Sequence, residues 1–267
     1  MAVLSVDLAY RSWADLGTVI LDRSSAHAAA GNSHQTLVSC EVVPWTSLAT
    51  ATGQPQAGEA IDPLDLANRL HTLCQARNIR VILLDGPQAW KSKFNELEFT
   101  RVSERALNCA AKTGLPGEVR PRTYTRFAEF SIAVFNALTL LGWNRLSTGR
   151  SPGDKPERVL VECYPHAAWK SLGLRPLPSK RRSGLRDMVD AWESLNSVIP
   201  AQANERLSHD QLQAIVGGLP GLALEEGDPA GYRIVGRPPH LEDGHWREGF
   251  IVLPMPPSHA PKIRWLE

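Results

Sequence analysis

The chain has 267 residues, a formal net charge of +1 and 43% hydrophobic residues. This length fits one large α/β domain or two small ones. The near-zero charge excludes a molecule-wide field for nucleic acid or membranes, so any polyanion site has to be a local patch. No apolar run approaches the roughly 20 residues of a membrane span, and the start of the chain reads as a strand rather than a signal peptide. Four widely spaced cysteines without a CxxC pair indicate buried free thiols in a reducing compartment, so we expect a cytoplasmic protein.

The first part of the chain is predicted to form three antiparallel strands. Residues 2–9, 17–23 and 34–45 are rich in β-prone apolar residues and are joined by short or polar connections, which is typical of a meander. After a surface loop at 49–63, apolar residues recur at helical spacing through "PLDLANRLHTLCQARN". This helix leads into a fourth strand, "IRVILLDG", and the strand, helix, strand order predicts that the fourth strand is parallel to the first.

The remainder of the chain is predicted to alternate helices with single strands. Helices are expected at 98–114 and 124–142, each ending at a glycine, and after the loop "RLSTGRSPGDKPE" a fifth strand is expected at 158–165. A short helix in "HAAWKSLG", a longer one broken near Gly184 and a third at 208–219 follow. Short late strands are expected in "GYRIVG" and "GFIVLP". We see no linker that divides the chain.

Carboxylates stand at the ends of these strands. The first strand runs into Asp7 and the fourth into Asp85. Either acid alone could be a turn former or a helix cap. On neighbouring strands they would repel by about 3 kcal/mol at ~5 Å and an effective dielectric near 20, and a divalent metal is the usual cation held by such a pair. Glu162 near the end of the fifth strand and Asp210 at a helix start are two further acids, although Asp210 also suits a helix dipole. Because ligands of open α/β sheets collect at the carboxyl ends of parallel strands, we interpret the acids as a metal-binding cluster.

The order of strands and acids resembles the RNase H-like fold, and more closely the bacterial and archaeal family of predicted RNase H-like nucleases. The stretches that carry the resemblance are "VDLA", "LLDGP", "RVSERALN", "VLVECYPHAAWKSLG", "SHDQLQA" and "REGFIVLP", which together span nearly the whole chain. The resemblance implies a mixed five-stranded sheet, with three antiparallel strands and then two parallel ones, flanked by helices. It implies a single domain over 1–267 with a helical insertion at about 91–157. The family usually has an Asp three residues after the His-Asp pair, where this chain has Gln213.

The resemblance also implies a nuclease or phosphodiesterase that depends on Mg²⁺ or Mn²⁺ and acts on nucleic acid. Two such ions activate the attacking water and stabilise the leaving oxygen, and three or four carboxylates are enough to hold them. We expect Asp7, Asp85 and Asp210 to be the metal ligands, with Asp7 bridging both ions. Glu162 is expected to be a fourth catalytic group, as a ligand or as a residue that orients a water. Gln213 can offer an oxygen but no charge.

Basic and histidine side chains near these motifs are candidates for substrate binding. They are Arg101, Arg105, His166, Lys180, Arg181, Arg182 and His209. A basic patch beside an acid cluster on a nearly neutral protein is what a grip on a phosphate backbone requires. The alternative for the arginines and the lysine is a solvated, salt-bridged surface, and for the histidines it is a helix cap or a packed residue.

Two other functions remain open at this stage. An ATP-using member of the actin and sugar-kinase superfamily would share the fold, but it needs a glycine-rich phosphate turn after the first strand, and here no glycine follows until Gly17. A non-catalytic binding module that kept the fold is the other alternative, and the neutral Gln213 favours it.

Overall fold

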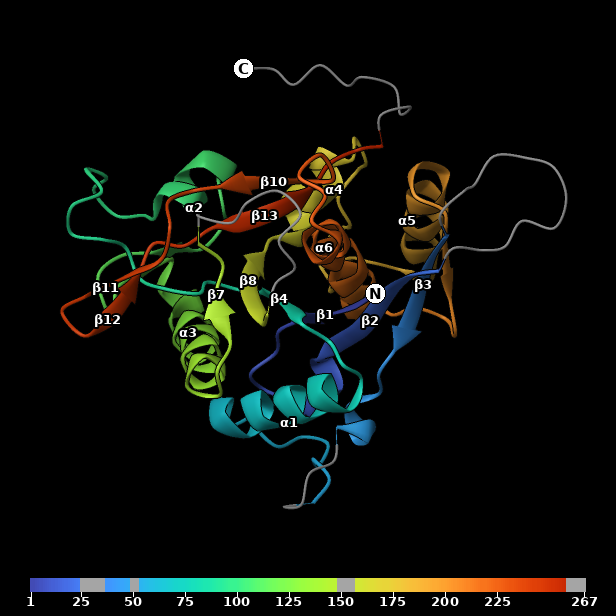
Figure 1. The fold of residues 1–267 in the computed structure, drawn as a ribbon, viewed down its shortest axis with the longest axis horizontal. Coiled ribbons are helices and arrows are strands. Elements are labelled where there is room, and N and C mark those ends of the chain that lie inside the picture. Colours follow the sequence, from blue (N-terminus) through green and yellow to red (C-terminus); the bar gives the residue numbers. More distant parts are fainter. Residues whose placement is uncertain (25–36, 49–52, 148–156, 258–267) are drawn as a thin grey trace, which may run out of the picture.

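A computed structural model describes residues 1–24, 37–48, 53–147 and 157–257. Most of the predicted loops "SSAHAAAGNSHQ" and "RLSTGRSPGDKPE", the start of the predicted strand at 34–45 and the first residues of the predicted loop at 49–63 lie outside the described residues. The prediction of a mixed α/β protein is confirmed, because helices cover both faces of a central mixed sheet (Figure 1).

The sheet has nine strands within the described residues. Its order is β10-β13-β8-β4-β1-β2-β3-β9, and β7 also pairs with β8. These strands are β1 (Ala2–Asp7), β2 (Gly17–Ser24), β3 (Leu37–Val42), β4 (Val81–Asp85), β7 (Asn144–Arg145), β8 (Val159–Cys163), β9 (Ala201–Ala203), β10 (Tyr232–Val235) and β13 (Ile251–Pro254). Two separate hairpins are formed by β5 (Lys112–Thr113) with β6 (Val119–Arg120) and by β11 (His240–Glu242) with β12 (His245–Arg247).

The five strands expected from the sequence form the centre of this sheet with the expected directions. β1 is antiparallel to β2 and β2 to β3, whereas β1, β4 and β8 are mutually parallel neighbours in that order. The expected number of strands is wrong, because β13 and β10 extend the sheet beyond β8 and β9 extends it beyond β3. The strands β7 and β9 have only two and three residues, too few to show an alternating pattern in the sequence.

Six α-helices and three short 3₁₀ helices are present among the described residues. They are α1 (Pro63–Ala76), α2 (Val102–Leu107), α3 (Thr125–Leu140), α4 (Pro165–Ser171), α5 (Leu185–Val198), α6 (His209–Glu226), η1 (Trp13–Asp15), η2 (Trp45–Ser47) and η3 (Arg122–Tyr124). The helix predicted at 98–114 is much shorter, because Asn108 adopts a left-handed conformation and ends α2. The helix predicted at 208–219 is longer and continues through Pro220 to Glu226.

Two hydrophobic cores lie on opposite faces of the sheet, and strand alternation decides which residue faces which core. Val3 and Leu83 belong to the core beneath α4, α5 and α6, whereas Leu4 and Leu84 belong to the core beneath α1 and α3. In Figure 1, α1 and α6 accordingly lie on opposite sides of the central strands. Asp7 has the parity of Val3, so its side chain is directed to the α6 face.

Helix α6 packs unusually close to the sheet because small residues line its inner face. A Cβ atom added at Gly218 would lie 2.6 Å from the Cβ of Ser5, and one at Gly221 would lie 2.3 Å from a methyl carbon of Leu83. At Gly217 it would lie 2.9 Å from the sulfur of Cys163. The glycines therefore seat α6 directly on β1, β4 and β8, which fixes where the N-terminus of this helix lies.

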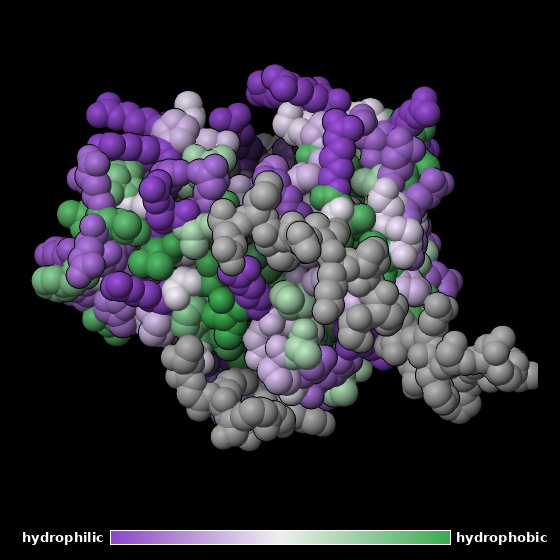
Figure 2. All heavy atoms as spheres, turned by 90° about the horizontal axis from the view of Figure 1, so that it is seen from above, coloured by the Kyte–Doolittle hydropathy of each residue, from purple (hydrophilic) through white to green (hydrophobic). Residues whose placement is uncertain are grey.

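The four cysteines are free and buried, as predicted. Among the described residues, no helix combines the length and hydropathy that a membrane crossing requires. Seen from above, the surface is mostly hydrophilic, with hydrophobic side chains in separate patches (Figure 2).

Candidate metal centre

Asp7 and Asp85 lie side by side at the carboxyl ends of two parallel strands. They are direct register partners, as the last residues of β1 and β4. Parallel partners project to the same face of a sheet, and both side chains therefore face α6. Each residue is half-buried. The convergence predicted from the two strand ends is thus present in the structure.

The N-terminus of α6 brings Asp210 and His209 to this pair. One ligand atom each from Asp7, His209 and Asp210 lies within 4.8 Å of the others, which is a spacing that could hold a metal ion. Gly17, the register partner of Asp7, makes this approach possible. A Cβ atom at Gly17 would lie 2.4 Å from the backbone oxygen of Asp210.

The hydrogen bonds of His209 fit a metal ligand. Its Nε2 lies 3.0 Å from the carbonyl oxygen of Pro178, and its Nδ1 lies 3.1 Å from a carboxylate oxygen of Asp210. An imidazolium would donate from both nitrogens, whereas a neutral imidazole that donates its Nε2 proton to the carbonyl would leave the Nδ1 lone pair free for a metal ion beside Asp210. A metal-bound histidine characteristically donates its other N–H to a carbonyl in this way. Carboxylate oxygens suit Mg²⁺ or Mn²⁺, and an imidazole nitrogen among the ligands favours the transition metal Mn²⁺ over Mg²⁺.

Lys180 lies on the same cluster from the solvent side. Its ammonium group donates to a carboxylate oxygen of Asp210 at 2.5 Å and to Asp15 at 2.7 Å. Partial burial alone would lower the pKa of Lys180, but these hydrogen bonds raise it above its ordinary value. The basic turn that contains Lys180 is therefore tied to the acid cluster, as the prediction of a basic patch beside the acids requires.

The carboxyl groups alter one another's protonation. Burial raises the pKa of Asp7 well above its ordinary value, and the charges of Asp85 and Asp210 raise it further. Burial also raises the pKa of Asp85 to about 7, although a hydrogen bond with Asp7 lowers it. For Asp210, burial is outweighed by hydrogen bonds with His209 and Lys180, which hold its pKa below the ordinary value. Without a metal ion, Asp7 and Asp85 therefore keep a proton near neutral pH, and a divalent cation would displace it.

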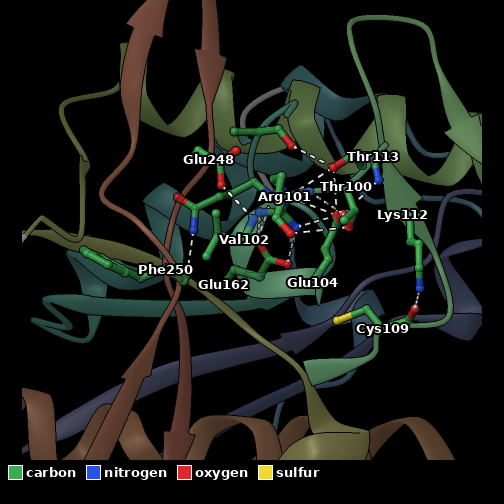
Figure 3. A network of polar contacts seen from close by, with 12 residues as sticks. Thr100, Arg101, Val102, Glu104, Cys109, Lys112, Thr113, Glu162, Glu248 and Phe250 are labelled. Atoms are coloured by element: carbon green, nitrogen blue, oxygen red, sulfur yellow. Dashed lines mark hydrogen bonds and ion pairs between the residues drawn. The ribbon is translucent and has the colours of Figure 1, made fainter. Parts of the chain in front are cut away.

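Glu162 does not join this cluster. It pairs in register with Leu84, whereas Cys163 pairs with Asp85. Since side chains alternate along β8, Glu162 faces the side of the sheet opposite to Asp7 and Asp85. There both of its carboxylate oxygens accept hydrogen bonds from the guanidinium group of Arg101, at 2.7 and 2.8 Å (Figure 3).

Arg101 is also placed differently from the sequence expectation. It is fully buried and pairs with Glu104 as well as Glu162. A solvated surface is therefore wrong for Arg101, and its buried guanidinium group has no surface for a phosphate. Arg105, one turn along α2 from Arg101, is exposed.

The other substrate candidates lie at varied places. Arg181 and Arg182 are exposed and follow Lys180 in the turn before α5. His166 is exposed in the first turn of α4. Gln213 is turned away from metal ligation, because its side-chain oxygen accepts a hydrogen bond from Nε1 of Trp169 at 2.8 Å.

Three residues of the site were not singled out from the sequence. Asp15 holds Lys180, Gly17 admits the N-terminus of α6, and Gln88 anchors the chain just after Asp85. A glycine at the start of a strand that follows an acid-bearing strand is a usable signal for close approach. Asp15 and Gln88 carry no comparable local signal.

No protein-family model matches the sequence, and no curated protein matches it. Among solved structures, a Thermus thermophilus RuvC structure is similar with a TM-score of 0.34 and 10% identity, over 81% of this chain and 90% of that chain. T. thermophilus RuvC in complex with Holliday junction substrate has a TM-score of 0.32 and 12% identity, over 85% of this chain and 97% of that chain. A structural similarity at this level does not indicate an activity. Any inference about activity therefore has to rest on the residues of the site.

Proposed function

We propose that this protein is a divalent-metal-dependent nuclease or phosphodiesterase of the RNase H-like type. The observation that carries the proposal is the convergence of Asp7, Asp85 and Asp210, with His209, at the carboxyl ends of β1 and β4. The central strand order β3-β2-β1-β4-β8 and its directions agree with the resemblance noted in the sequence and support the same reading.

The carboxylates fit Mg²⁺ or Mn²⁺, and the imidazole nitrogen of His209 favours Mn²⁺. One ion would be held by Asp7, Asp210 and His209. A second ion would be held by Asp85 together with Asp7. Bound there, the ions supply an activated water and stabilise the leaving oxygen of a phosphodiester. The chain's own contribution is to fix the ligands: β1 and β4 fix the two sheet acids, and the carbonyl of Pro178 orients the imidazole of His209.

The substrate in this proposal is nucleic acid. The exposed turn of Lys180, Arg181 and Arg182 adjoins Asp210 and offers positive charge for a phosphate backbone beside the acids. Lys180 is held by Asp15 and Asp210, so Arg181 and Arg182 are the free members of the turn for phosphate contact among the described residues.

The activity is tested with labelled single-stranded, duplex and branched DNA and RNA in Mg²⁺, in Mn²⁺ and in EDTA. Cleavage that requires a divalent ion and is abolished by Asp7→Asn and by Asp210→Asn is expected. Asp190→Asn is the matched control, because this aspartate has a side chain 64% exposed on α5. Cleavage that persists in Asp7→Asn would show that the proposed metal centre is not the catalytic site. Metal binding without hydrolysis of any substrate would instead favour the non-catalytic binding module.

Backbone recognition is tested by the salt dependence of binding. Replacing Arg181 and Arg182 together with Ala should reduce the slope of log K against log salt by about 0.7–0.9 for each phosphate that the variant no longer neutralises. The measurement is fluorescence anisotropy of a labelled oligonucleotide between low and moderate salt. An unchanged slope would show that Arg181 and Arg182 do not contact phosphates and belong to an ordinary solvated surface.

A further inference from the structure

Gln88, three residues after Asp85, is held from several sides in the interior. Its backbone N–H donates to Glu162 at 3.0 Å, and its backbone carbonyl accepts from the guanidinium group of Arg145. Its side-chain amide donates to the carbonyl of Phe250 at 2.7 Å. The residue is 1% exposed. The short turn that leaves β4 is thereby fastened at its far end.

Glu162 is itself fastened by a buried ion pair. Arg101, which is 0% exposed, grips both carboxylate oxygens of Glu162 and also donates to Glu104 at 2.9 Å. Glu104 accepts in turn from the backbone N–H and the hydroxyl of Thr113, at 2.9 and 2.7 Å. Figure 3 shows Arg101 between the two glutamates. Arg101, Glu104 and Glu162 therefore belong to one buried network, which contacts the chain just after β4 through Gln88.

We propose that Arg101 and Glu162 are positioning residues that brace the turn Gly86–Gln88 and so fix Asp85. This inference rests on the proposed function, because it assigns the brace to the metal site. Removing charged groups from water generally costs more than filling the same volume with apolar side chains. A pair retained in the core at this cost is better explained by the geometry it imposes, and the loop it holds begins at the residue after Asp85.

The metal ligand Asp85 and the bracing residue Glu162 lie on opposite faces of the sheet, at the carboxyl end of β4. Asp85 faces α6, whereas Glu162 lies on the opposite face and contacts the chain only after it has turned at Gly86. Gly86 has a φ of +150°, and a Cβ atom there would lie 2.5 Å from the hydroxyl oxygen of Ser131. The turn is thus confined against α3 on one side and held by Glu162 at its end. Groups that hydrogen-bond directly to a metal ligand typically contribute 10–100-fold to metal affinity, and we expect an effect of the same order from a brace that acts through the turn.

The test compares two buried glutamates that contact the chain at opposite ends of β4, Glu162 after the strand and Glu225 before it. Glu162→Gln leaves one oxygen for both Gln88 and Arg101, so the brace is weakened. Glu225→Gln is the control, because Glu225 is also buried and pairs with Arg80, just before β4 begins. Gln88→Leu removes the other anchor of the turn, the side-chain bond to the carbonyl of Phe250, and keeps the backbone N–H that donates to Glu162.

Two readouts are measured on each folded variant: hydrogen exchange of residues 86–90 without metal, and Mn²⁺ affinity by calorimetry. We expect Glu162→Gln and Gln88→Leu to speed exchange of this segment and to weaken Mn²⁺ binding about 10–100-fold. Glu225→Gln should change neither. Unchanged exchange at 86–90 in Glu162→Gln would overturn the brace, and faster exchange with unchanged Mn²⁺ affinity in this variant would overturn its link to Asp85. A wild-type protein that binds no Mn²⁺ would refute the proposed function, whereas the exchange data would still decide whether the brace holds the turn.

Discussion

Replacing Asp7 with Asn should stabilise the metal-free protein at alkaline pH. Asp7 and Asp85 are register partners, and neighbouring strands lie about 4.8 Å apart. Two charges at about 5 Å in an effective dielectric of 20 repel by about 3 kcal/mol. In Asp7→Asn this repulsion is absent, and the amide can still donate a hydrogen bond to Asp85, as protonated Asp7 does.

The sign of the pH dependence follows from the raised pKa of Asp7. Folded wild type keeps a proton on Asp7 that the unfolded chain loses above about pH 4. Wild type therefore loses stability relative to its unfolded state as pH rises from about 4, until the folded protein also gives up the proton. The Asn variant lacks this loss. Its advantage in the free energy of unfolding should grow between pH 4 and pH 8 by at least about 3 kcal/mol, because burial of Asp7 adds to the repulsion from Asp85.

The assay is urea denaturation followed by tryptophan fluorescence in EDTA at several pH values, then repeated with Mn²⁺. Titratable groups that do not contact Asp7 cancel in the difference, whereas Asp85, which shares a hydrogen bond with Asp7, contributes to it. Asp190→Asn serves as a control for loss of an exposed charge. In saturating Mn²⁺ the order should reverse, because an ion that binds the folded state of wild type stabilises it by mass action. If Asp7→Asn is less stable than wild type at pH 8 in EDTA, Asp7 is a structural residue and the reasoning fails.

Three further predictions concern the same site. Mn²⁺ affinity of wild type should rise between pH 6 and pH 7 by about tenfold per pH unit for each proton displaced, since the pKa of Asp85 is about 7, and calorimetry in two buffers would detect the released protons. Gly17→Ala should push the backbone of Asp210 away and lower Mn²⁺ affinity, while Gly184→Ala, at a helix start with room for a methyl group, should leave the affinity unchanged in the same titration. Gln213→Asp should not tighten Mn²⁺ binding, because the side chain faces Trp169, and a tighter ion in calorimetry would show that it reaches the site.

The strand ends were predictable because their signals are local. Asp7 and Asp85 each end an apolar run, and a helix between the runs indicates parallel neighbours. The face to which Glu162 points was not predictable. The sequence "VLVEC" is apolar on both sides, as in buried parallel strands, so no alternation reveals the orientation. A shift of one residue in register exchanges the two faces, and that register is set by tertiary packing.

The buried position of Arg101 was equally hidden. On a predicted helix, Arg101 and Glu104 have the spacing of a solvent-exposed pair. They are buried because Glu162, which is distant in sequence, supplies a second carboxylate in the interior. For His209, the N-cap at Ser208 was predictable from the sequence, but the direction of the imidazole depends on the carbonyl of Pro178 in another segment. Long-range partners of this kind have no trace in local sequence patterns.

The seating of α6 on the sheet has a consequence for how the protein is made. Asp7 and Asp210 stand near opposite ends of the chain, and they meet only when α6 has docked on β1 through its glycine face. Contacts with such large sequence separation form late and slowly during folding. A nascent or truncated chain that lacks α6 therefore has two repelling acids and no third ligand. In the proposed metal centre, the full set of ligands is therefore in place only after synthesis has passed α6.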